Sequence, residues 1–536
     1  MATTAPGRIE EEINKYTLLL SDPRAEKNSF LPIFRLPPET LACVFTHGAR
    51  DYHEGNDHLT FRVPQWVNVS YICRHWRSVA LNCPTLWTYH FTVSQRWTKE
   101  LLARSKQASL KIHVNYGYRG GILWWSRLVK KLLNHAERIQ ELRLNILGDI
   151  LPTELTLNAP RLQILDIHFQ DCSSERTFVV NNGDTLPLRT LKLSDCPLPW
   201  HSSLNLSRVT TLFLCRVPCP SLKEFLATLS RMQALAVLHL DRTLADSRSF
   251  LSSEAFCVSP RVKLPCLTRL FIRALLSTVV ALLSCMDVPL KTQLRLEIQS
   301  EANSSADDYD QLPSLLAQRF SRTKDPLSSS PAIRSLVISS LVHERRFTIS
   351  ASEHGNCDSH LSKMHPPQDC NVHLMIIVSL GRPMVIRNME DLISDICCSI
   401  PSTHVQTLHL SNSPFSHNFW KKTLGHFDGL RYMKLSDGDM PDLVSLLALP
   451  ADGPGDATND HDLTLGHAFV PALEELKLDC ITFSSEDDFS DGAVSKQSLL
   501  DALTTRKALR LNVIEYDVKV GDELCQCRVC RLEEFE

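Results

Sequence analysis

The chain has 536 residues, 43% of them hydrophobic and 22% charged, a composition typical of folded rather than disordered proteins. Its 57 basic and 60 acidic residues give a net charge of -3, which offers no electrostatic reason to expect nucleic acid as a partner. Glycine is scarce at 18 residues, and neither GxxxxGK[ST] nor GxGxxG occurs, so no nucleotide cofactor is expected. The length suits two or more domains, or one elongated repeat array.

Residues 1–30 are expected to form a helix and a linker. IEEEINKYTLLL (9–20) has helical spacing, and SDPRAEKNS (21–29) is expected to break the helix. The N-terminus is polar and lacks a stretch of signal-peptide type, and the longest apolar run, 274–286, is too short to span a bilayer and suits a buried helix. We therefore expect an intracellular protein, nuclear or cytoplasmic, with no membrane partner and with its 18 cysteines reduced.

Residues 31–92 carry the pattern of about three short helices. Pro37 and Pro38 can open the first helix, and Gly48 is expected to end it before a loop over 49–64. Apolar side chains at helical spacing indicate the following helix and a final turn: Val69, Cys73, Trp76, Ala80, Leu86 and Trp87. These are more apolar positions than one inward stripe can hold, which favours a small core together with a partner-binding face.

The stretch LPPETLACVF, followed by VSYICRHWRSVA and PTLW, resembles an F-box in the F-box-like form common in large fungal families. The resemblance covers roughly residues 34–90, and the loop over 49–64 is longer than the compact F-box pattern. F-boxes dock on the Skp adaptor of cullin–RING ubiquitin ligases through apolar helix faces. The adaptor-binding residues that the resemblance implies are Leu36, Pro37, Leu41, Val44, Phe45, Cys73, Trp76, Leu86 and Trp87.

Beyond Trp97 an apolar pattern of the form LxxLxL recurs. Its ten copies begin at Ile139, Leu162, Leu188, Val209, Leu235, Leu267, Ile333, Val405, Leu430 and Leu473. The first five intervals are 23, 26, 21, 26 and 32 residues, which overlaps the period of roughly 20–29 residues typical of leucine-rich repeats. Helical patterns at 221–230 and 389–400 lie between copies, and strand followed by helix at this period predicts an α/β solenoid.

In such a solenoid the parallel strands line the concave side, and the residue between two leucines points outward. The target-binding surface predicted in this way comprises Arg143, Asp166, Lys192, Phe213, His239, Phe271, His409, Lys434 and Lys477, with Val337 at the equivalent apolar position. The alternative for any one of these residues is an ordinary solvated face.

No constellation in the sequence indicates catalysis. GxSxG, HExxH and protein-kinase signatures are missing, so no catalytic residue is expected and the chain is not expected to be an enzyme. The tail CQCRVC carries Cys525, Cys527 and Cys530 without a matching second pair, so no metal site is expected there.

The sequence therefore predicts an α/β protein: a small N-terminal all-α F-box-like domain followed by an irregular leucine-rich-repeat solenoid. The expected boundaries are 1–30 for the N-terminal helix and linker, 31–92 for the F-box-like domain, 93–520 for the solenoid and 521–536 for the Cys-containing tail. Polar segments near 299–330, 343–370 and 450–467 are expected to be disordered insertions.

The resemblance implies a non-catalytic substrate-recognition subunit of an SCF-type (Skp–cullin–F-box) E3 ubiquitin ligase. Its partners would be the Skp adaptor, through it the cullin and RING subunits, and a target protein held by the repeats. Two alternatives stay open. One is an adaptor-independent leucine-rich-repeat scaffold whose N-terminal helices only cap the first repeat, and the other is an unrecognised enzyme working through the insertions or terminal thiols. The target, and whether it must be phosphorylated, are left open.

Overall fold

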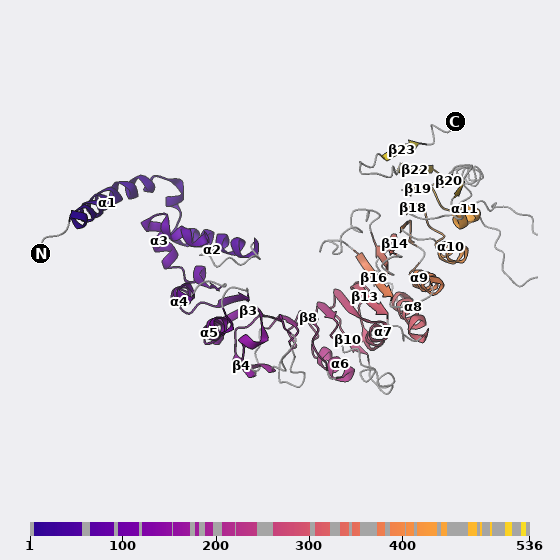
Figure 1. Ribbon diagram of the computed structural model, residues 1–536, viewed down its shortest axis with the longest axis horizontal. Helices are drawn as coiled ribbons and strands as arrows, with labels where there is room; N and C mark the ends of the chain where they lie inside the picture. Colours follow the sequence, from indigo (N-terminus) through magenta and orange to yellow (C-terminus); the bar gives the residue numbers. More distant parts are fainter. Residues whose placement is uncertain are drawn as a thin grey trace, which may run out of the picture. The chain divides into compact units, whose positions relative to one another are not determined.

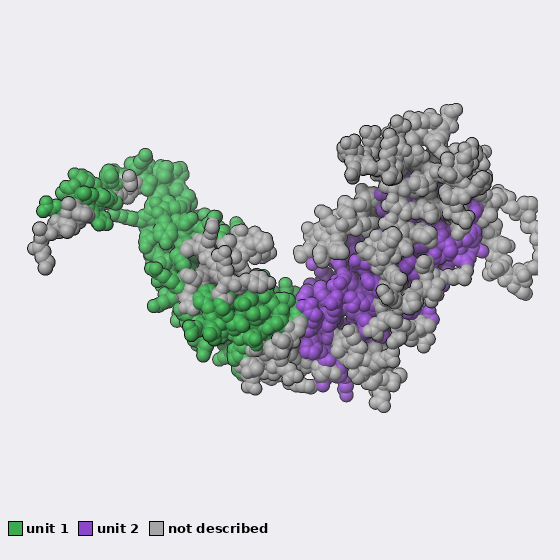
Figure 2. Space-filling view, in the orientation of Figure 1, with its two compact units in different colours: residues 1–211 green, residues 212–536 purple. Residues whose placement is uncertain are grey.

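The computed structural model shows a mixed α/β protein with a mostly parallel sheet, and it divides into two compact units, residues 1–211 and 212–536 (Figure 2). The division lies inside the predicted repeat region rather than at its start. The structure describes residues 5–55, 65–90, 95–116, 121–152, 154–171, 177–181, 188–196, 206–219, 221–243, 261–300, 306–321, 333–341, 346–353, 372–380, 386–401, 404–411, 415–436, 441–447, 470–479, 483–484, 494–495, 510–516 and 527–531.

The first unit begins with helices. They are α1 (Ala5–Ser29), η1 (Pro32–Arg35), α2 (Pro38–Gly55), η2 (Gln65–Tyr71), α3 (Arg74–Leu81), η3 (Pro84–Trp87) and α4 (Gln95–Arg104). The expected break at 21–29 is wrong, because α1 continues through Pro23 to Ser29. A proline removes one amide donor, but Leu19, four residues before Pro23, is exposed, so water can bond the carbonyl that loses its helical partner.

The expectation that Gly48 ends the first helix of the motif is also wrong. Helix α2 runs on to Gly55, so the segment between the motif helices is shorter than the predicted 49–64, and residues 56–64 lie outside the described residues. Glycine costs a helix about 1 kcal/mol relative to alanine. Burial of Ala49, which is fully buried, and packing of Tyr52 against the same core outweigh that cost.

The core of these helices is built around two tryptophans. Trp87 is fully buried, lies edge-on to Trp66 with ring centroids 5.4 Å apart, and donates from Nε1 to the Ala80 carbonyl at 2.7 Å. Leu41 and Leu86 are fully buried in the same cluster. Burying an aromatic side chain of this size contributes several kcal/mol, which a helical region this small needs in order to fold.

A parallel sheet follows in the same unit. Its elements are β1 (Tyr89–His90), β2 (Leu110–Asn115), α5 (Ile122–Leu133), η4 (Ala136–Arg138), β3 (Ile139–Ile146), η5 (Gly148–Ile150), β4 (Glu154–Asn158), β5 (Ile164–Phe169), β6 (Thr177–Asn181) and β7 (Thr190–Ser194). Strands β1, β2, β3, β5 and β7 pair in that order, and β4 pairs separately with β6. The register aligns Leu142, Leu165 and Leu191, so the apolar residues of successive predicted copies stack in one row.

The second unit repeats this arrangement. Its elements up to α8 are β8 (Thr211–Cys215, of which Thr211 belongs to the first unit), α6 (Leu222–Ser230), β9 (Val237–Asp241), β10 (Val262–Lys263), β11 (Arg269–Leu275), α7 (Leu276–Cys285), β12 (Met286–Asp287), β13 (Gln293–Ser300) and α8 (Ala306–Ser321). The later ones are β14 (Ser335–Leu341), β15 (Arg346–Ser352), β16 (Val372–Leu380), α9 (Ile386–Ser399), β17 (Thr407–Ser411), α10 (His417–Leu424), β18 (Tyr432–Ser436), α11 (Pro441–Leu447), β19 (Glu475–Asp479), β20 (Phe483–Ser484), β21 (Val494–Ser495), β22 (Arg510–Tyr516) and β23 (Cys527–Arg531).

All ten predicted LxxLxL copies reach into strands: β3, β5, β7, β8, β9, β11, β14, β17, β18 and β19. Their leucines are buried, and the side chains between them form the other face of the sheet, which we call the polar face. In the second unit α6 to α10 line one side of the strands (Figure 1), and α7 packs against β11 and β13. Helices at 221–230, 274–286 and 389–400 are confirmed as α6, α7 and α9.

Strand order departs from chain order around β15. Strand β13 pairs in parallel with β16, β15 lies antiparallel between β16 and β14, and β14 pairs in parallel with β17. Disorder over 299–330 is therefore wrong for α8, whose Leu312 and Leu316 are buried, and disorder over 343–370 is wrong for β15. The predicted insertion at 450–467 lies outside the described residues.

The turns that leave β7, β8 and β9 share one backbone conformation. Asp195, Arg216 and Arg242 each have a positive φ, of 53°, 50° and 47°. In the next position Thr243 is buried and donates from its hydroxyl to the Leu214 carbonyl of the neighbouring strand segment at 2.8 Å. A residue with a positive φ therefore follows directly after each of these three strands.

Candidate functional site

The nine residues of the adaptor-binding prediction divide by exposure. Leu41, Phe45, Leu86 and Trp87 are buried in the core of the helices, and Leu36, Cys73 and Trp76 are half-buried. Pro37 and Val44 are exposed, Val44 with 51% of its surface accessible. The exposed members are the ones positioned to contact a partner, while the buried ones hold the helices that carry them.

Further apolar side chains are exposed in or directly beside the helices of this region. Phe30, Leu31 and Ile33 lie around η1, and Tyr71 and Ile72 come just before α3, at 71%, 49%, 38%, 64% and 58% exposure. We call these five residues and Val44 the apolar patch. Ring contacts hold their elements together.

Aromatic contacts join three elements, η1, α2 and α3. Phe34 of η1 lies 5.7 Å from His75 of α3, and Phe45 of α2 lies 5.0 Å from Trp76 of α3, measured between ring centroids. Cys73 caps α3, because its Sγ accepts the Trp76 amide at 3.3 Å. The motif residues Cys73 and Trp76 therefore fix the start of α3 relative to α2 and η1.

Charged residues form a row on the polar face of the first unit. Arg143, Asp166 and Lys192 occupy matching positions on β3, β5 and β7, and His113 on β2 pairs with Arg143. Glu141, two residues before Arg143 on β3, joins this row through its carboxylate, which lies 2.8 Å from His113 Nε2 and 2.7 Å from Arg143 Nε. The structure thus brings the first three predicted target-binding residues together.

The surroundings shift the pKa values of two carboxylates here, Glu141 and Asp166, in opposite directions. Burial opposes ionisation of Glu141, but the hydrogen bond from His113 and the charges of His113 and Arg143 lower its pKa overall. Burial raises the pKa of Asp166, and the nearby charges of Lys192 and Arg143 offset only part of that effect. The row is therefore not a simple solvated surface, because its carboxylates are partly desolvated.

Aromatic rings form a stack on the polar face of the second unit. The ring centroids of Phe213 and His239 are 3.9 Å apart, and those of His239 and Phe271 are 4.0 Å apart, with interplanar angles of 17° and 6°. We call these three residues the aromatic ladder. Arg295 extends it, with its guanidinium carbon 5.3 Å from the centroid of Phe271. The three residues of the aromatic ladder were all predicted to bind the target; Arg295 was not.

The remaining predicted residues lie on another part of the second unit. Val337, His409, Lys434 and Lys477 occupy matching positions on β14, β17, β18 and β19. Val337 and His409 are buried, and His409 Nε2 lies 3.2 Å from Ser436 Oγ. Lys434 and Lys477 are half-buried.

The polar face also holds His113, Glu141 and Arg295, which the LxxLxL pattern did not predict. Arg295 lies on β13, where Lys291 occupies the position of the first apolar residue of LxxLxL, so the copy was not recognised. The signal that could have found this strand is the alternation of Leu294, Leu296 and Ile298 by itself.

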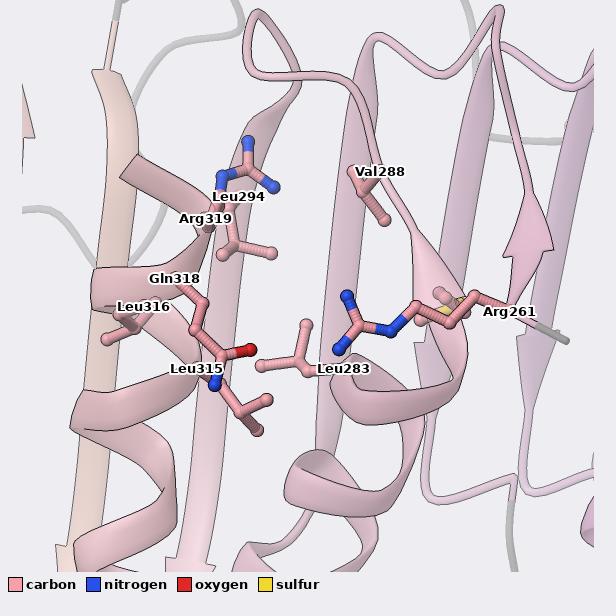
Figure 3. A pocket seen from close by; sticks show the side chains of 9 residues that line it. Arg261, Leu283, Val288, Leu294, Leu315, Leu316, Gln318 and Arg319 are labelled. Carbon is pink, nitrogen blue, oxygen red and sulfur yellow. The ribbon is translucent and has the colours of Figure 1, made fainter. Parts of the chain in front are cut away.

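A pocket between α7 and α8 encloses about 450 Å³, including its open mouth (Figure 3). Leu283, Leu294 and Leu315 are among its apolar lining residues, and Arg261 points into it. Burial lowers the pKa of Arg319 to about 10. Its Nη2 donates to three backbone carbonyls, those of Pro289, Leu290 and Thr292, so this guanidinium supports the chain leading into β13.

The described residues contain no group of three or more His, Cys, Asp or Glu side chains able to hold a metal ion. Of the tail cysteines, Cys527 and Cys530 lie in β23, whose backbone pairs antiparallel with β22, and Cys525 lies outside the described residues. Within the described part of the chain, no helix is both long and apolar enough to cross a membrane.

No protein-family model matches the chain, and no curated protein matches it in sequence.

Proposed function

We propose that the chain is the substrate-recognition subunit of an SCF-type E3 ubiquitin ligase. The observation that carries the proposal is the apolar patch: Val44, Tyr71 and Ile72 lie in the segments that resemble an F-box, and Phe30, Leu31 and Ile33 lie just before them. Isolated exposed apolar residues are ordinary on protein surfaces, but several on adjoining elements mark an interaction site. The patch would contact the Skp adaptor, through which cullin and RING subunits join.

The second part of the proposal is that the sheet and its helices form an irregular leucine-rich-repeat solenoid. Its support is the stacking of the LxL leucines in register and the repeated left-handed turn after β7, β8 and β9. In a solenoid of this type the polar face of the strands is the concave face, where a target protein would bind. The chain itself would perform no chemistry, and holding a target near the conjugating enzyme raises the effective concentration of the two.

Because Val44 and Ile72 are exposed, substituting them tests adaptor binding without disturbing the core. Val44→Asp with Ile72→Asp places charge on two exposed side chains of the apolar patch, so the fold should be kept while docking is lost. Leu123→Asp is the matched control, since Leu123 on α5 is 75% exposed and lies outside the patch. After co-expression with a Skp adaptor, size exclusion should show a one-to-one complex for the wild type and the control, and no complex for the double variant.

One observation favours an adaptor-independent scaffold instead. The N-terminal helices join the first strands directly: the Lys111 amide of β2 donates to the Thr88 carbonyl, next to η3, at 3.0 Å, and α4 contacts both η3 and β1. A solenoid cap would make the same contacts. A folded wild-type protein that forms no complex with the adaptor would establish the scaffold and overturn the ligase proposal.

A further inference from the structure

We propose that the aromatic ladder, together with the arginines around it, binds an acidic peptide segment that carries an apolar side chain among its carboxylates. The inference deepens the proposed function, on which it rests only in taking that segment to be part of the target protein. Four observations carry it: the stacking of the rings, the exposure of the surrounding charges, the alignment of the strands, and the excess of arginines over carboxylates among the described residues of this surface.

The stacking determines which part of each ring a partner can reach. His239 has a ring on either side, 3.9 Å from Phe213 and 4.0 Å from Phe271, and Arg295 lies beyond Phe271. The faces of His239 are therefore occupied by its neighbours, and the half-buried rings of Phe213 and Phe271 offer their edges to a ligand. Ring edges carry partial positive charge and attract carboxylate and carbonyl oxygens as well as apolar groups.

Beside the ladder, the arginine side chains are more exposed than the carboxylates. Arg216 and Arg269 are exposed, and the side chains of Arg242 and Arg273 are 50% and 38% exposed. The carboxylates on the same strands are more covered, with Asp241 at 18% and Glu297 at 14%.

The carboxylates of this surface are also already paired. Arg273 lies 3.9 Å from Asp241 and 3.3 Å from Glu297, and Arg295 lies 2.5 Å from Glu297. Arg269 has no such carboxylate beside it among the ion pairs of the described residues, and Arg242 has only a 4.0 Å contact with Asp241. A partner therefore meets guanidinium groups first, and complementarity of charge selects an anionic one.

The register places these groups in adjacent rows. His239 pairs with Phe271 and Phe271 with Arg295, while Asp241 pairs with Arg273 and Arg273 with Glu297, one step further along each strand on the same face. A peptide lying across the strands would set an apolar side chain against the ring edges. Its flanking carboxylates would reach the arginines on either side of the ladder.

The stacking also decides between a peptide and a single-stranded nucleic acid, which is anionic too. Nucleic-acid bases bind proteins by stacking on the faces of aromatic rings. Both faces of His239 are used within the ladder, and Phe271 lies between His239 and the Arg295 guanidinium, so a peptide fits this surface better.

Fluorescence anisotropy with the full chain tests the proposal. The probe is a labelled nonapeptide with a central leucine and four glutamates on each side, compared with peptides in which lysines replace the glutamates or glycine replaces the leucine. We expect the glutamate–leucine peptide to bind at least about tenfold more tightly than either, and more weakly as salt is raised, because exposed charges are screened. Equal affinity for the glutamate and lysine peptides, or no binding, would overturn the proposal.

Variants locate the site. Arg242→Glu with Arg269→Glu should weaken binding at least about tenfold, whereas Lys223→Glu, an exposed cation on α6, should leave it unchanged. Phe271→Ala should abolish the preference for leucine over glycine. Loss of affinity in Lys223→Glu equal to that of the double variant would refute the assigned site, as would tight binding of oligothymidylate that the double variant removes.

Co-purification with the Skp adaptor, measured on the same proteins, separates the two proposals. Failure of the peptide to bind a chain that still forms the adaptor complex refutes the ladder site alone. Failure of the adaptor complex with intact peptide binding refutes the ligase proposal and leaves the ladder site standing.

Discussion

At the scale of single residues, the two carboxylates of the first unit show how position decides the sign of an effect. Glu141 accepts from His113 and Arg143, so its charged form is stabilised in the fold. Asp166 occupies the next strand but has no ion pair among the described residues within the distance of a salt bridge, and burial dominates. At neutral pH the ionised carboxylate of Glu141 therefore stabilises the folded protein, whereas that of Asp166 destabilises it.

Glu141→Gln should destabilise the protein at pH 7 by about 1–2 kcal/mol, the usual cost of losing hydrogen bonds to charged partners. Because its pKa is lowered in the fold, the stabilisation from Glu141 is present above the ordinary value of 4.5 and is lost as pH falls through the lowered pKa. Denaturant unfolding at pH 7 and at about pH 3 should show the difference from wild type shrinking in acid. A pH-independent difference would contradict this assignment.

Asp166→Asn should have the opposite effect. Its pKa is raised in the fold, so the penalty for the charged form is present above that raised pKa and disappears below the ordinary value of 3.8. We expect a higher melting temperature than wild type at pH 7 and an equal one at about pH 3. A variant less stable than wild type at neutral pH would show that Lys192 and Arg143 outweigh burial.

At the scale of elements, alternation was enough to predict the strands, because the leucines of LxL must alternate with polar residues to cover one face only. The sequence pattern failed where local preference and packing disagree. Gly48 is a helix-ending residue by propensity, yet Ala49 and Tyr52 continue α2. The polar segment before α8 suggested a loop, although Leu312, Leu316 and Phe320 repeat at helical spacing and are buried.

For the candidate sites, the sequence predicted which residues are involved but not how their side chains are arranged. Position between two leucines identified Phe213, His239 and Phe271, but no pattern in one strand shows that their rings stack, because stacking depends on register. The resemblance identified the motif helices, while the exposure that separates Val44 from buried Phe45 depends on how α2 packs. Neighbouring positions of a helix face in different directions, and sequence alone does not orient the helix.

Gly48→Ala should stabilise α2. The position is exposed, nothing lies within 4 Å of the methyl group that would be added, and its φ is not in the left-handed region. Alanine is favoured over glycine inside a helix by about 1 kcal/mol. Circular dichroism should record a higher melting temperature, and an unchanged or lower one would indicate that Gly48 is needed as a helix end.

At the scale of the molecule, the proposed solenoid predicts that a destabilising substitution in one repeat affects only that repeat and its neighbours. Trp87→Ala removes a fully buried ring and its hydrogen bond to Ala80, a loss of about 3–5 kcal/mol. Because a repeat contacts mainly its neighbours, amide exchange should speed up in α2, α3 and β2 but not in β17 and β18. Hydrogen-exchange mass spectrometry measures this directly, and equal acceleration along the chain would contradict a repeat architecture.

The inverted strand order around β15 has a consequence for how the chain folds. Most neighbouring strands come from nearby sequence, as Leu270 pairs with Leu294, but Leu294 then pairs with Leu374, 80 positions further along. During synthesis the edge of β13 therefore stays open while α8, β14 and β15 are made, and closing so long a loop is slow. An open parallel edge is the part of a sheet most able to capture a strand from another molecule. The interval between the synthesis of β13 and of β16 is thus when the growing protein most needs protection from aggregation.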